Sequence, residues 1–214
     1  MAPNCPRVIF LIDKSQFKDE KYKLQIHLAC LRTLSFYAHN SANQAAKTGV
    51  LWGYKFFNSS SQDLKYGCKR YPFLDFTTKC FDSFEKELYA IEENTKVEST
   101  KDFCSNVRRT LTDLLSDFHW ERPELLSPSK KGISNLLEDV NNLVFLFCPA
   151  PLNEELAHYF GVKDPTKSNL LDNIITKSLY AKFVVELKIK LFWVDSKYME
   201  HDEKVESLFN LYLI

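Results

Sequence analysis

The chain has 214 residues, enough to bury the core of one domain, although the length alone does not exclude two small ones. Apolar residues make up 45% of it, with 17 Phe, 10 Tyr and 3 Trp, so we expect a folded protein with an aromatic-rich interior. Lysine plus arginine and aspartate plus glutamate both total 28, and this zero net charge disfavours nucleic acid as the main partner and direct DNA binding by this segment.

Residues 7–12 (RVIFLI) form a short, apolar and β-branched run, which predicts a strand buried on both faces. Residues 20–38 predict an amphipathic helix. Its expected apolar stripe comprises Leu24, Leu28, Leu31, Leu34 and Ala38. Residues 50–57 (VLWGYKFF) predict a second strand, which ends at the turn-forming run 58–61 (NSSS).

The middle of the chain predicts an edge strand and two helices. The edge strand is expected around residues 71–76, within an otherwise irregular segment at 65–78. The first helix has Asp82 and Glu85 at capping-box spacing near its start, and the second must end before Pro123. The apolar residues that mark the two helices are Phe81, Phe84, Leu88 and Ile91 in the first, and Phe103, Val107, Leu111, Leu114, Leu115 and Phe118 in the second.

The last third predicts, in order, a buried strand at 143–147, a short helix at 154–160 ended by Gly161, a helix at 170–179, one long or two short strands within 183–194 with the main strand at 189–194, and a final helix at 205–213. The chain stops in an apolar run, and we expect it to be the N-terminal fragment of a longer protein. Apolar strands separated by amphipathic helices predict a parallel sheet. The expected fold is one α/β domain over residues 1–214, three-layered, with a mostly parallel sheet and helices on both faces.

The six cysteines include no C-x-x-C pair, so we expect reduced, mostly buried thiols in an intracellular protein rather than a disulfide scaffold. They are Cys5, Cys30, Cys68, Cys80, Cys104 and Cys148. No apolar stretch reaches transmembrane length, and the run before Asp13 is too short for a signal peptide. A soluble protein without membrane association is predicted.

In an open parallel sheet, ligands bind beyond the carboxyl ends of the strands. The first predicted strand is followed by Asp13-Lys14-Ser15-Gln16-Phe17, which is similar to the Asp-x-Ser-x-Ser metal signature of von Willebrand A domains. Asp13, Ser15 and Thr100 are therefore candidate ligands of a magnesium ion.

The metal signature is incomplete. Phe17 takes the place of a hydroxyl, and Cys148 stands where an acid is expected after the strand at 143–147. Magnesium requires near-octahedral oxygen ligation, so we expect a degenerate site without metal. The alternative is that Asp13 and Ser15 cap the turn that follows the strand.

Other chemistries lack the residues they need. Five glycines form neither GxGxxG nor a P-loop, so phosphates have no backbone amide cradle. The five histidines lie in no catalytic motif, and no paired cysteine or histidine spacing suits zinc. We therefore expect no enzymatic activity and no cofactor.

Residues 111–130 (LTDLLSDFHWERPELLSPSK) carry the most specific motif of the chain. Ser127 precedes proline, with Lys130 beyond it, the pattern that a proline-directed kinase reads, so Ser127 is a candidate site of regulatory phosphorylation. Trp120 and Arg122 are candidate partner-binding residues. The alternatives are a proline that only ends local structure and a Trp120 that packs the loop onto the helix ends.

Several segments resemble the Treslin (TICRR) family. Residues 52–58 (WGYKFFN) resemble its W-x-x-K-F-F-D segment, and residues 83–88 (SFEKEL) are similar to its S-W-E-D-F-E-E-E-L stretch. Residues 111–130 resemble L-L-x-Y-x-W-D-R-P-E-x-x-S-P-T-K, and the strand at 144–148 fits V-F-L-x-x-P-C-P. The matches span roughly residues 7–160 in the same order.

The resemblance implies a nuclear, non-enzymatic factor in starting DNA replication. It implies that the full-length protein works with MTBP and a multi-BRCT scaffold protein, under cyclin-dependent kinase control, to help activate the replicative helicase. An A-domain-like fold comparable to that of the Ku proteins would suit the family. The family's kinase-dependent contact with the BRCT scaffold lies well downstream, so it is not transferred to Ser127.

Three hypotheses follow. The first is an A-domain-like interaction module of a Treslin-type replication initiation factor. The second is a metal-dependent ligand-binding A domain that uses Asp13, Ser15 and Thr100. The third is an enzyme with a divergent α/β active site at the strand ends.

Overall fold

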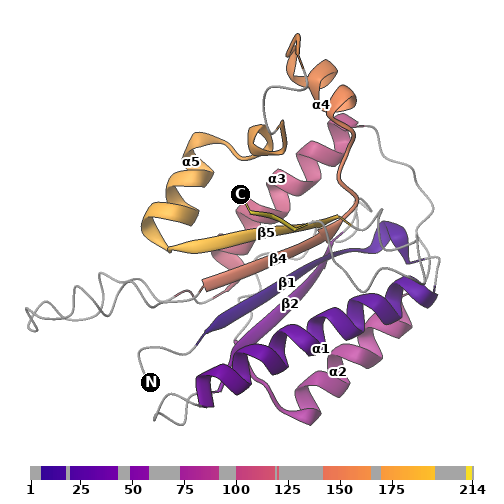
Figure 1. Ribbon diagram of the computed structural model, residues 1–214, viewed down its shortest axis with the longest axis vertical. Helices are drawn as coiled ribbons and strands as arrows, with labels where there is room; N and C mark the ends of the chain where they lie inside the picture. The colour runs from indigo at the N-terminus through magenta and orange to yellow at the C-terminus, as the bar shows by residue number, and fades with distance from the viewer. Residues whose placement is uncertain are drawn as a thin grey trace, which may run out of the picture.

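Four parallel strands form the centre of the sheet, in the order β2-β1-β4-β5 (Figure 1). They are β1 (Arg7–Asp13), β2 (Leu51–Phe57), β4 (Asn142–Cys148) and β5 (Ile189–Asp195). All seven residues of β1 are buried, as the middle of a parallel sheet covered on both faces requires. The four strands predicted at these places are confirmed.

The structure is a computed structural model that describes residues 6–17, 20–42, 49–57, 73–91, 100–118, 120, 142–164, 170–195 and 211–213. Several predictions lie outside these residues: the turn at 58–61, most of the irregular segment at 65–78, Arg122, Ser127, Cys5, Cys68, and residues 205–210 of the predicted last helix.

The two edge strands are antiparallel, which makes the six-stranded sheet mixed, in the order β3-β2-β1-β4-β5-β6. β3 (Leu74–Asp75) pairs with β2 and confirms the predicted edge strand in a shorter form. β6 (Leu211–Leu213) pairs with β5, so the prediction of helix is wrong for these three residues. A short apolar run has no periodicity that separates strand from helix, and here a distant strand supplies the hydrogen-bonding partners.

One face of the sheet is covered by α1 (Glu20–Ala42) and α2 (Thr78–Ala90) (Figure 1). Alternation along β1 sends Val8, Phe10 and Ile12 toward these helices. The core on this face is rich in aromatic rings. Its ring contacts include Phe10 with Trp52, Trp52 with Phe84, and Phe56 with Phe84.

The opposite face is covered by α3 (Thr100–Asp117), α4 (Asn153–Phe160) and α5 (Lys177–Tyr180). Ile9 and Leu11 of β1 point into this second core. Helices on both faces of the sheet confirm the predicted three-layer α/β arrangement. Among the described helices, none combines the length and the apolar character that crossing a lipid bilayer requires.

The predicted core stripe of α1 is wrong for two of its leucines. Leu24 and Leu28 are exposed, whereas Leu34 is buried as expected. The buried residues of α1 are Tyr22, Lys23, Ile26, Ala29, Cys30 and Leu34, and all but Lys23 belong to the core on this face of the sheet. Apolar residues lie on both the inner and the outer face of this helix, so the leucines alone do not identify the inner one.

The start of α2 also differs from its prediction. Thr77 is the N-cap, and its Oγ1 accepts a hydrogen bond from the backbone N–H of Cys80 at 3.3 Å. Asp82 and Glu85 lie inside the helix, so the predicted capping box is wrong. α4 ends as predicted at Gly161, whose φ of 67° is the left-handed conformation that glycine adopts most readily.

The segment 170–186 contains a short 3₁₀ helix and, after two non-helical residues at 175–176, a second helical stretch that changes from α to π geometry. A 3₁₀ turn at Leu170–Ile174 and α5 replace the continuous helix predicted at 170–179. A π-helical turn at Ala181–Glu186 follows, so the strand considered at 183–186 is wrong. The turn buries Phe183 in the core on the α3 side of the sheet. A short apolar run such as the one around Phe183 is compatible with either a strand or a helix, so the sequence alone did not identify the turn.

Candidate functional site

The strand order reverses between β1 and β4, and the crevice at the carboxyl ends of two such strands is the usual ligand site of an open α/β sheet. β1 ends at Asp13 and β4 ends at Cys148. β5 ends beside them at Asp195, which pairs with Cys148 in the ladder. Two buried carboxylates and a buried thiol therefore end three neighbouring strands.

Asp13 holds the turn that follows β1. Its Oδ1 accepts a hydrogen bond from the backbone N–H of Ser15 at 2.8 Å, and Asp13 is the N-cap of the 3₁₀ turn Lys14–Gln16. This geometry matches the capping alternative to metal binding. One carboxylate oxygen at the switch point is thus engaged with the protein's own backbone.

The third position of the A-domain-like signature is occupied by an aromatic ring instead of a hydroxyl. Phe17 is buried, and its ring centroid lies 5.8 Å from that of Tyr22 and 6.1 Å from that of Phe56. Thr100 is the first residue of α3. In the described part of the chain, no three or more His, Cys, Asp or Glu side chains are grouped to hold a metal ion. The third oxygen position of the signature therefore belongs to the aromatic core.

Asp195 fixes the backbone as it leaves β4. Its Oδ1 accepts a hydrogen bond from the N–H of Ala150 at 3.0 Å, and the indole N–H of Trp193 donates to the carbonyl of Cys148 at 3.2 Å. The sequence did not single out Asp195, although an acid directly after the apolar run 189–194 is a signal of the same kind as Asp13. Both carboxylates at this edge therefore order backbone.

The Cys148 thiol is held in its protonated form. Complete burial raises its pKa well above the ordinary value, and the negative charges of Asp13 and Asp195 raise it further. A thiol of this kind is a poor nucleophile at neutral pH, because the thiolate is the reactive species. The geometry suits a packed residue at the strand end.

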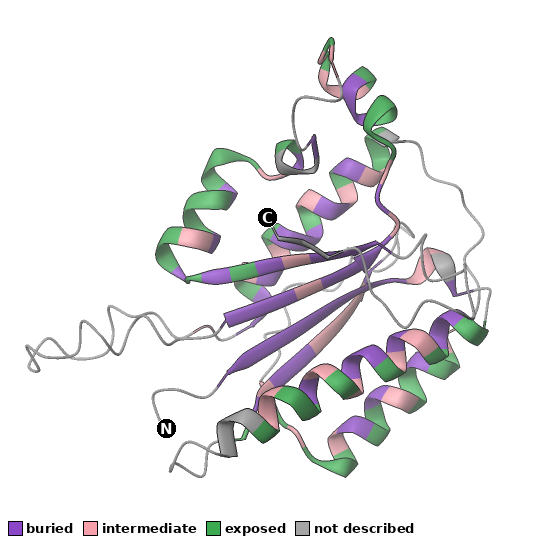
Figure 2. Cartoon of the chain, viewed as in Figure 1, coloured by how far each residue is buried: buried purple, intermediate pink, exposed green. Residues whose placement is uncertain are grey.

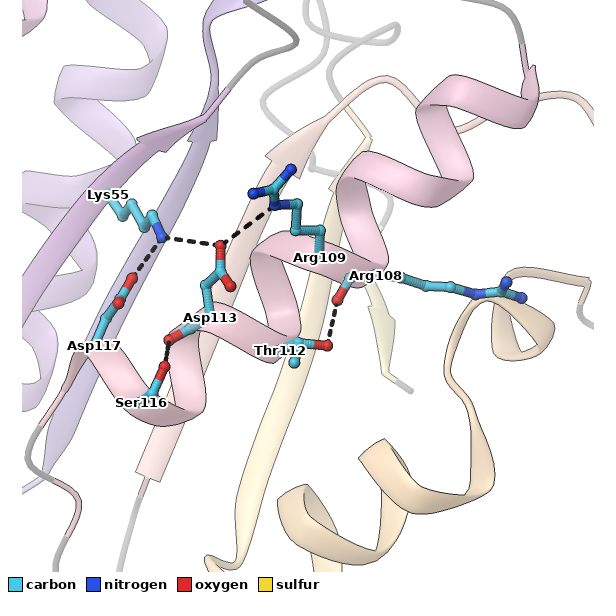
Figure 3. A network of polar contacts seen from close by, with 7 residues as sticks. All are labelled: Lys55, Arg108, Arg109, Thr112, Asp113, Ser116 and Asp117. Atoms are coloured by element: carbon cyan, nitrogen blue, oxygen red, sulfur yellow. Dashed lines mark hydrogen bonds and ion pairs between the residues drawn. The ribbon is translucent and has the colours of Figure 1, made fainter. Parts of the chain in front are cut away.

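A second polar group links β2 to α3 (Figure 3). The ammonium of Lys55 donates a short hydrogen bond to Oδ2 of Asp117 and lies 3.8 Å from Oδ2 of Asp113. Arg109 reaches the same Asp113 oxygen at 4.0 Å. Asp117 is nearly buried, so Lys55 supplies the charge that compensates its carboxylate. No local pattern predicted this pair, because 62 positions separate its members.

On another side of α3, Arg108 links this helix to the segment 170–174. Its Nε donates to the carbonyl of Ile174 at 2.7 Å, and one terminal nitrogen donates to the carbonyl of Asn173 at 2.9 Å. The guanidinium also lies over the ring of Phe160, 5.7 Å from its centroid. The broken segment 170–174 is therefore anchored to α3 by charge-assisted hydrogen bonds.

Trp120 packs onto the end of α3. Its indole N–H donates to the carbonyl of Leu114 at 3.1 Å, in the helix turn whose carbonyls lack intrahelical partners. Its ring meets that of Phe73 edge-on, with the centroids 5.5 Å apart. These contacts correspond to the packing alternative for Trp120. Its part in binding a partner stays a prediction, as do the roles of Arg122 and Ser127, which lie outside the described residues.

The family-like segment of β2 alternates between the two cores. Trp52 is fully buried beneath α2, and its indole N–H donates to the carbonyl of Asp75 at 3.3 Å. Gly53 faces α3, where an added Cβ would lie 2.5 Å from Cε1 of Phe118. Lys55 points the same way and reaches Asp117. The motif residues thus set the spacing between the sheet and the helices on both of its faces.

The chain is similar to one family of proteins and to two curated members of it. The family described as "Treslin, N-terminal domain" matches residues 6–184. Treslin of Xenopus laevis is 27% identical over 223 aligned residues, which cover 92% of this chain and 11% of that protein. Treslin of Danio rerio is 26% identical over 186 residues, covering 72% of this chain and 10% of that protein. The chain spans about a tenth of the length of these curated relatives. No solved structure matches the chain significantly.

Proposed function

The chain belongs to the Treslin family through its N-terminal domain, and from this premise we propose that it is a non-enzymatic protein-interaction module of a DNA replication initiation factor. The family match over residues 6–184 carries the proposal. The full-length protein would act in the nucleus, supporting helicase activation and origin firing under cyclin-dependent kinase control. Its partners would be MTBP and a multi-BRCT scaffold protein.

The carboxyl edge of the sheet supports a role in binding proteins rather than in catalysis. Asp13 accepts from the N–H of Ser15 and Asp195 accepts from the N–H of Ala150, so both buried carboxylates hold local backbone. The pKa of the Cys148 thiol lies well above its ordinary value because of burial. Side chains that hold the local backbone in this way make the domain rigid, and a rigid domain can present its outer surfaces to partner proteins.

An A-domain-like fold is part of the proposal. It is supported by the strand order β3-β2-β1-β4-β5-β6, by the short antiparallel β3 at one edge, and by helices on both faces of the sheet. Phe17 in place of a metal-coordinating hydroxyl fits a domain of this kind retained for its surfaces.

A depletion-and-replacement experiment in cells tests the proposed function. Cells that lack the endogenous protein receive either the full-length protein or a version without residues 6–184, and origin firing is measured by DNA-fibre labelling. We expect the deletion to reduce firing while nuclear localisation is retained. Unchanged firing would show that this domain has no part in replication initiation.

The variant Ser15→Ala separates an interaction module from an enzyme. It removes a hydroxyl at the switch point but keeps the backbone N–H that donates to Asp13. An interaction module should support normal firing with this variant. Lost firing with an unchanged melting temperature would instead indicate chemistry at the strand ends.

A further inference from the structure

The outer face of α1 carries a straight ridge of four residues, Leu24, Leu28, Arg32 and Phe36, each four positions after the last. Residues at this spacing lie next to one another along a helix. Leu24, Leu28 and Phe36 are 47%, 38% and 62% exposed, and Arg32 is exposed between the last two. Figure 2 shows such exposed positions recurring along α1 beside its buried ones.

The core does not explain this ridge. Tyr22, Ile26 and Leu34 already fill the inner face of α1, and the ridge points away from them. Of the seven large apolar side chains that are exposed in the described part of the chain, three belong to this ridge. A fourth, Tyr89 of the adjacent α2, lies with its ring 6.1 Å from that of His27 of α1. A row of exposed apolar side chains that the core does not use is the kind of surface through which proteins bind one another.

The charge of Arg32 indicates that the partner is acidic. On α1, Lys23 forms an ion pair with Glu20, and Nδ1 of His27 lies 3.5 Å from Oε1 of Glu85, whereas Arg32 is paired with no carboxylate of the described residues. The guanidinium of Arg32 therefore stands between Leu28 and Phe36, ready to meet a carboxylate on whatever covers the ridge.

The four-residue spacing of the ridge indicates that the partner is a helix. A ridge of residues four apart fits the groove between the corresponding ridges of a second helix, which is the commonest way in which helices of globular proteins pack. We propose that the ridge Leu24–Leu28–Arg32–Phe36 is the docking site for an acidic amphipathic helix of a protein partner. The inference rests on the proposed interaction function and names its surface. The partner helix presents apolar residues three or four apart and a carboxylate that pairs with Arg32.

Site-specific photocrosslinking tests the docking site on the full-length protein in cells. p-Benzoylphenylalanine is placed at position 28 on the ridge and, as matched exposed controls on other elements, at positions 152 and 185. Mass spectrometry identifies the crosslinked peptide. We expect position 28 to crosslink to a segment with apolar residues at helical spacing and acidic residues among them.

A charge series sharpens the test. Arg32→Glu should lower the crosslink yield from position 28 about tenfold, because it places like charges opposite one another, whereas Arg32→Lys should retain most of the yield. Arg32 is exposed, so neither variant should change the melting temperature of the chain. If the crosslink yield from position 28 is the same with Glu and with Lys at position 32, the proposal of an acidic partner is wrong.

The remaining outcomes separate this inference from the proposed function. Crosslinks from positions 152 or 185 alone would overturn the ridge and leave the interaction function standing. Crosslinks from position 28 to a second copy of the chain or to lipid would overturn the proposed occupant. No crosslink to any protein from position 28 would overturn the docking site, whereas the interaction function is overturned by unchanged origin firing after deletion of residues 6–184.

Discussion

The ring of Phe118 closes over Gly53, so that a Cβ built on this glycine would lie 2.5 Å from ring carbon Cε1. The same Cβ would lie 3.1 Å from Cδ1 of Ile9. Phe118 directly follows α3, and Gly53 lies in the middle of β2. The absence of a side chain at position 53 therefore allows the end of α3 to approach the sheet closely.

Gly53→Ala should destabilise the fold by about 1–3 kcal/mol, because the methyl group overpacks a full core. The free energy of unfolding is measured by urea denaturation. Gly49→Ala is the matched control, since no atom lies within 4 Å of its Cβ, and it should be neutral or slightly stabilising. Equal effects at the two glycines would contradict the close approach of Phe118.

Removing the ammonium of Lys55 should leave Asp117 as an uncompensated carboxylate. Lys55→Met is expected to cost about 1–3 kcal/mol of unfolding free energy, because the Asp117 side chain is only 8% exposed. In the double variant with Asp117→Asn, much of this loss should be recovered. Arg109→Met is the control: its exposed contact with Asp113 should be worth less than about 0.5 kcal/mol. An equal loss in the two single variants would argue against a special role for Lys55.

The sequence predicted the parallel strands well because a strand buried on both faces must be apolar throughout, as β1 is. It did not predict which face of α1 meets the sheet: Tyr22 and Ile26 lie on the buried inner face, whereas Leu24 and Leu28 are exposed. Burial on α1 is decided by the sheet beneath it, and nothing local separates a leucine that meets the sheet from one that meets solvent.

Contacts between segments far apart in the chain could not be predicted from local sequence patterns either. β6 is a strand because it pairs with β5, and Lys55 is compensated by residues on α3. Asp13 was found because it directly follows an apolar strand, and the same rule applied to β5 would have found Asp195. The candidate site could therefore be read from strand ends, while the polar links between layers required the fold.

Lys188 has a φ of 53° in the turn before β5 and is the one described non-glycine residue with positive φ. An L-amino acid with a Cβ is strained in this region, by roughly 1–2 kcal/mol. Lys188→Gly should therefore raise the unfolding free energy by about 0.5–1 kcal/mol after the added freedom of the unfolded chain is counted. Lys190→Gly, inside β5, should instead lower it by a similar amount. A loss of stability in Lys188→Gly would show that its side chain makes a contact worth more than the strain.

The cysteines should differ in reactivity according to burial. Cys30 and Cys148 are buried, and burial raises the pKa of both thiols well above the ordinary value, whereas Cys80 is partly exposed. Iodoacetamide labelling of the native protein, read by peptide mass spectrometry, should modify Cys80 long before the other two. Rapid modification of Cys148 in the folded chain would contradict its buried, protonated state.

The same thiols make stability dependent on alkaline pH. The unfolded chain loses a thiol proton near its ordinary pKa of about 8.5, whereas the folded chain retains the proton on Cys148 to higher pH. The stabilisation is complete below about pH 8.5 and is lost as pH rises through the folded-state pKa. Urea denaturation across pH 7 to 10 (roughly the range that spans the ordinary thiol pKa) should show this fall. Cys148→Ala should make it shallower, and an unchanged slope would assign the fall to other groups.

Asp13 distinguishes the interaction module from a metal-dependent A domain. Its Oδ1 already accepts from the N–H of Ser15, and Phe17 supplies no ligand, so titration with Mg²⁺ or Mn²⁺ should give no binding heat. Asp13→Ala should lower the unfolding free energy by about 1 kcal/mol through loss of the cap, and Asp13→Asn, which keeps a side-chain acceptor, should lose less. Micromolar metal binding that Asp13→Ala abolishes would reverse the assignment, because a carboxylate that only caps a turn has no reason to bind a cation.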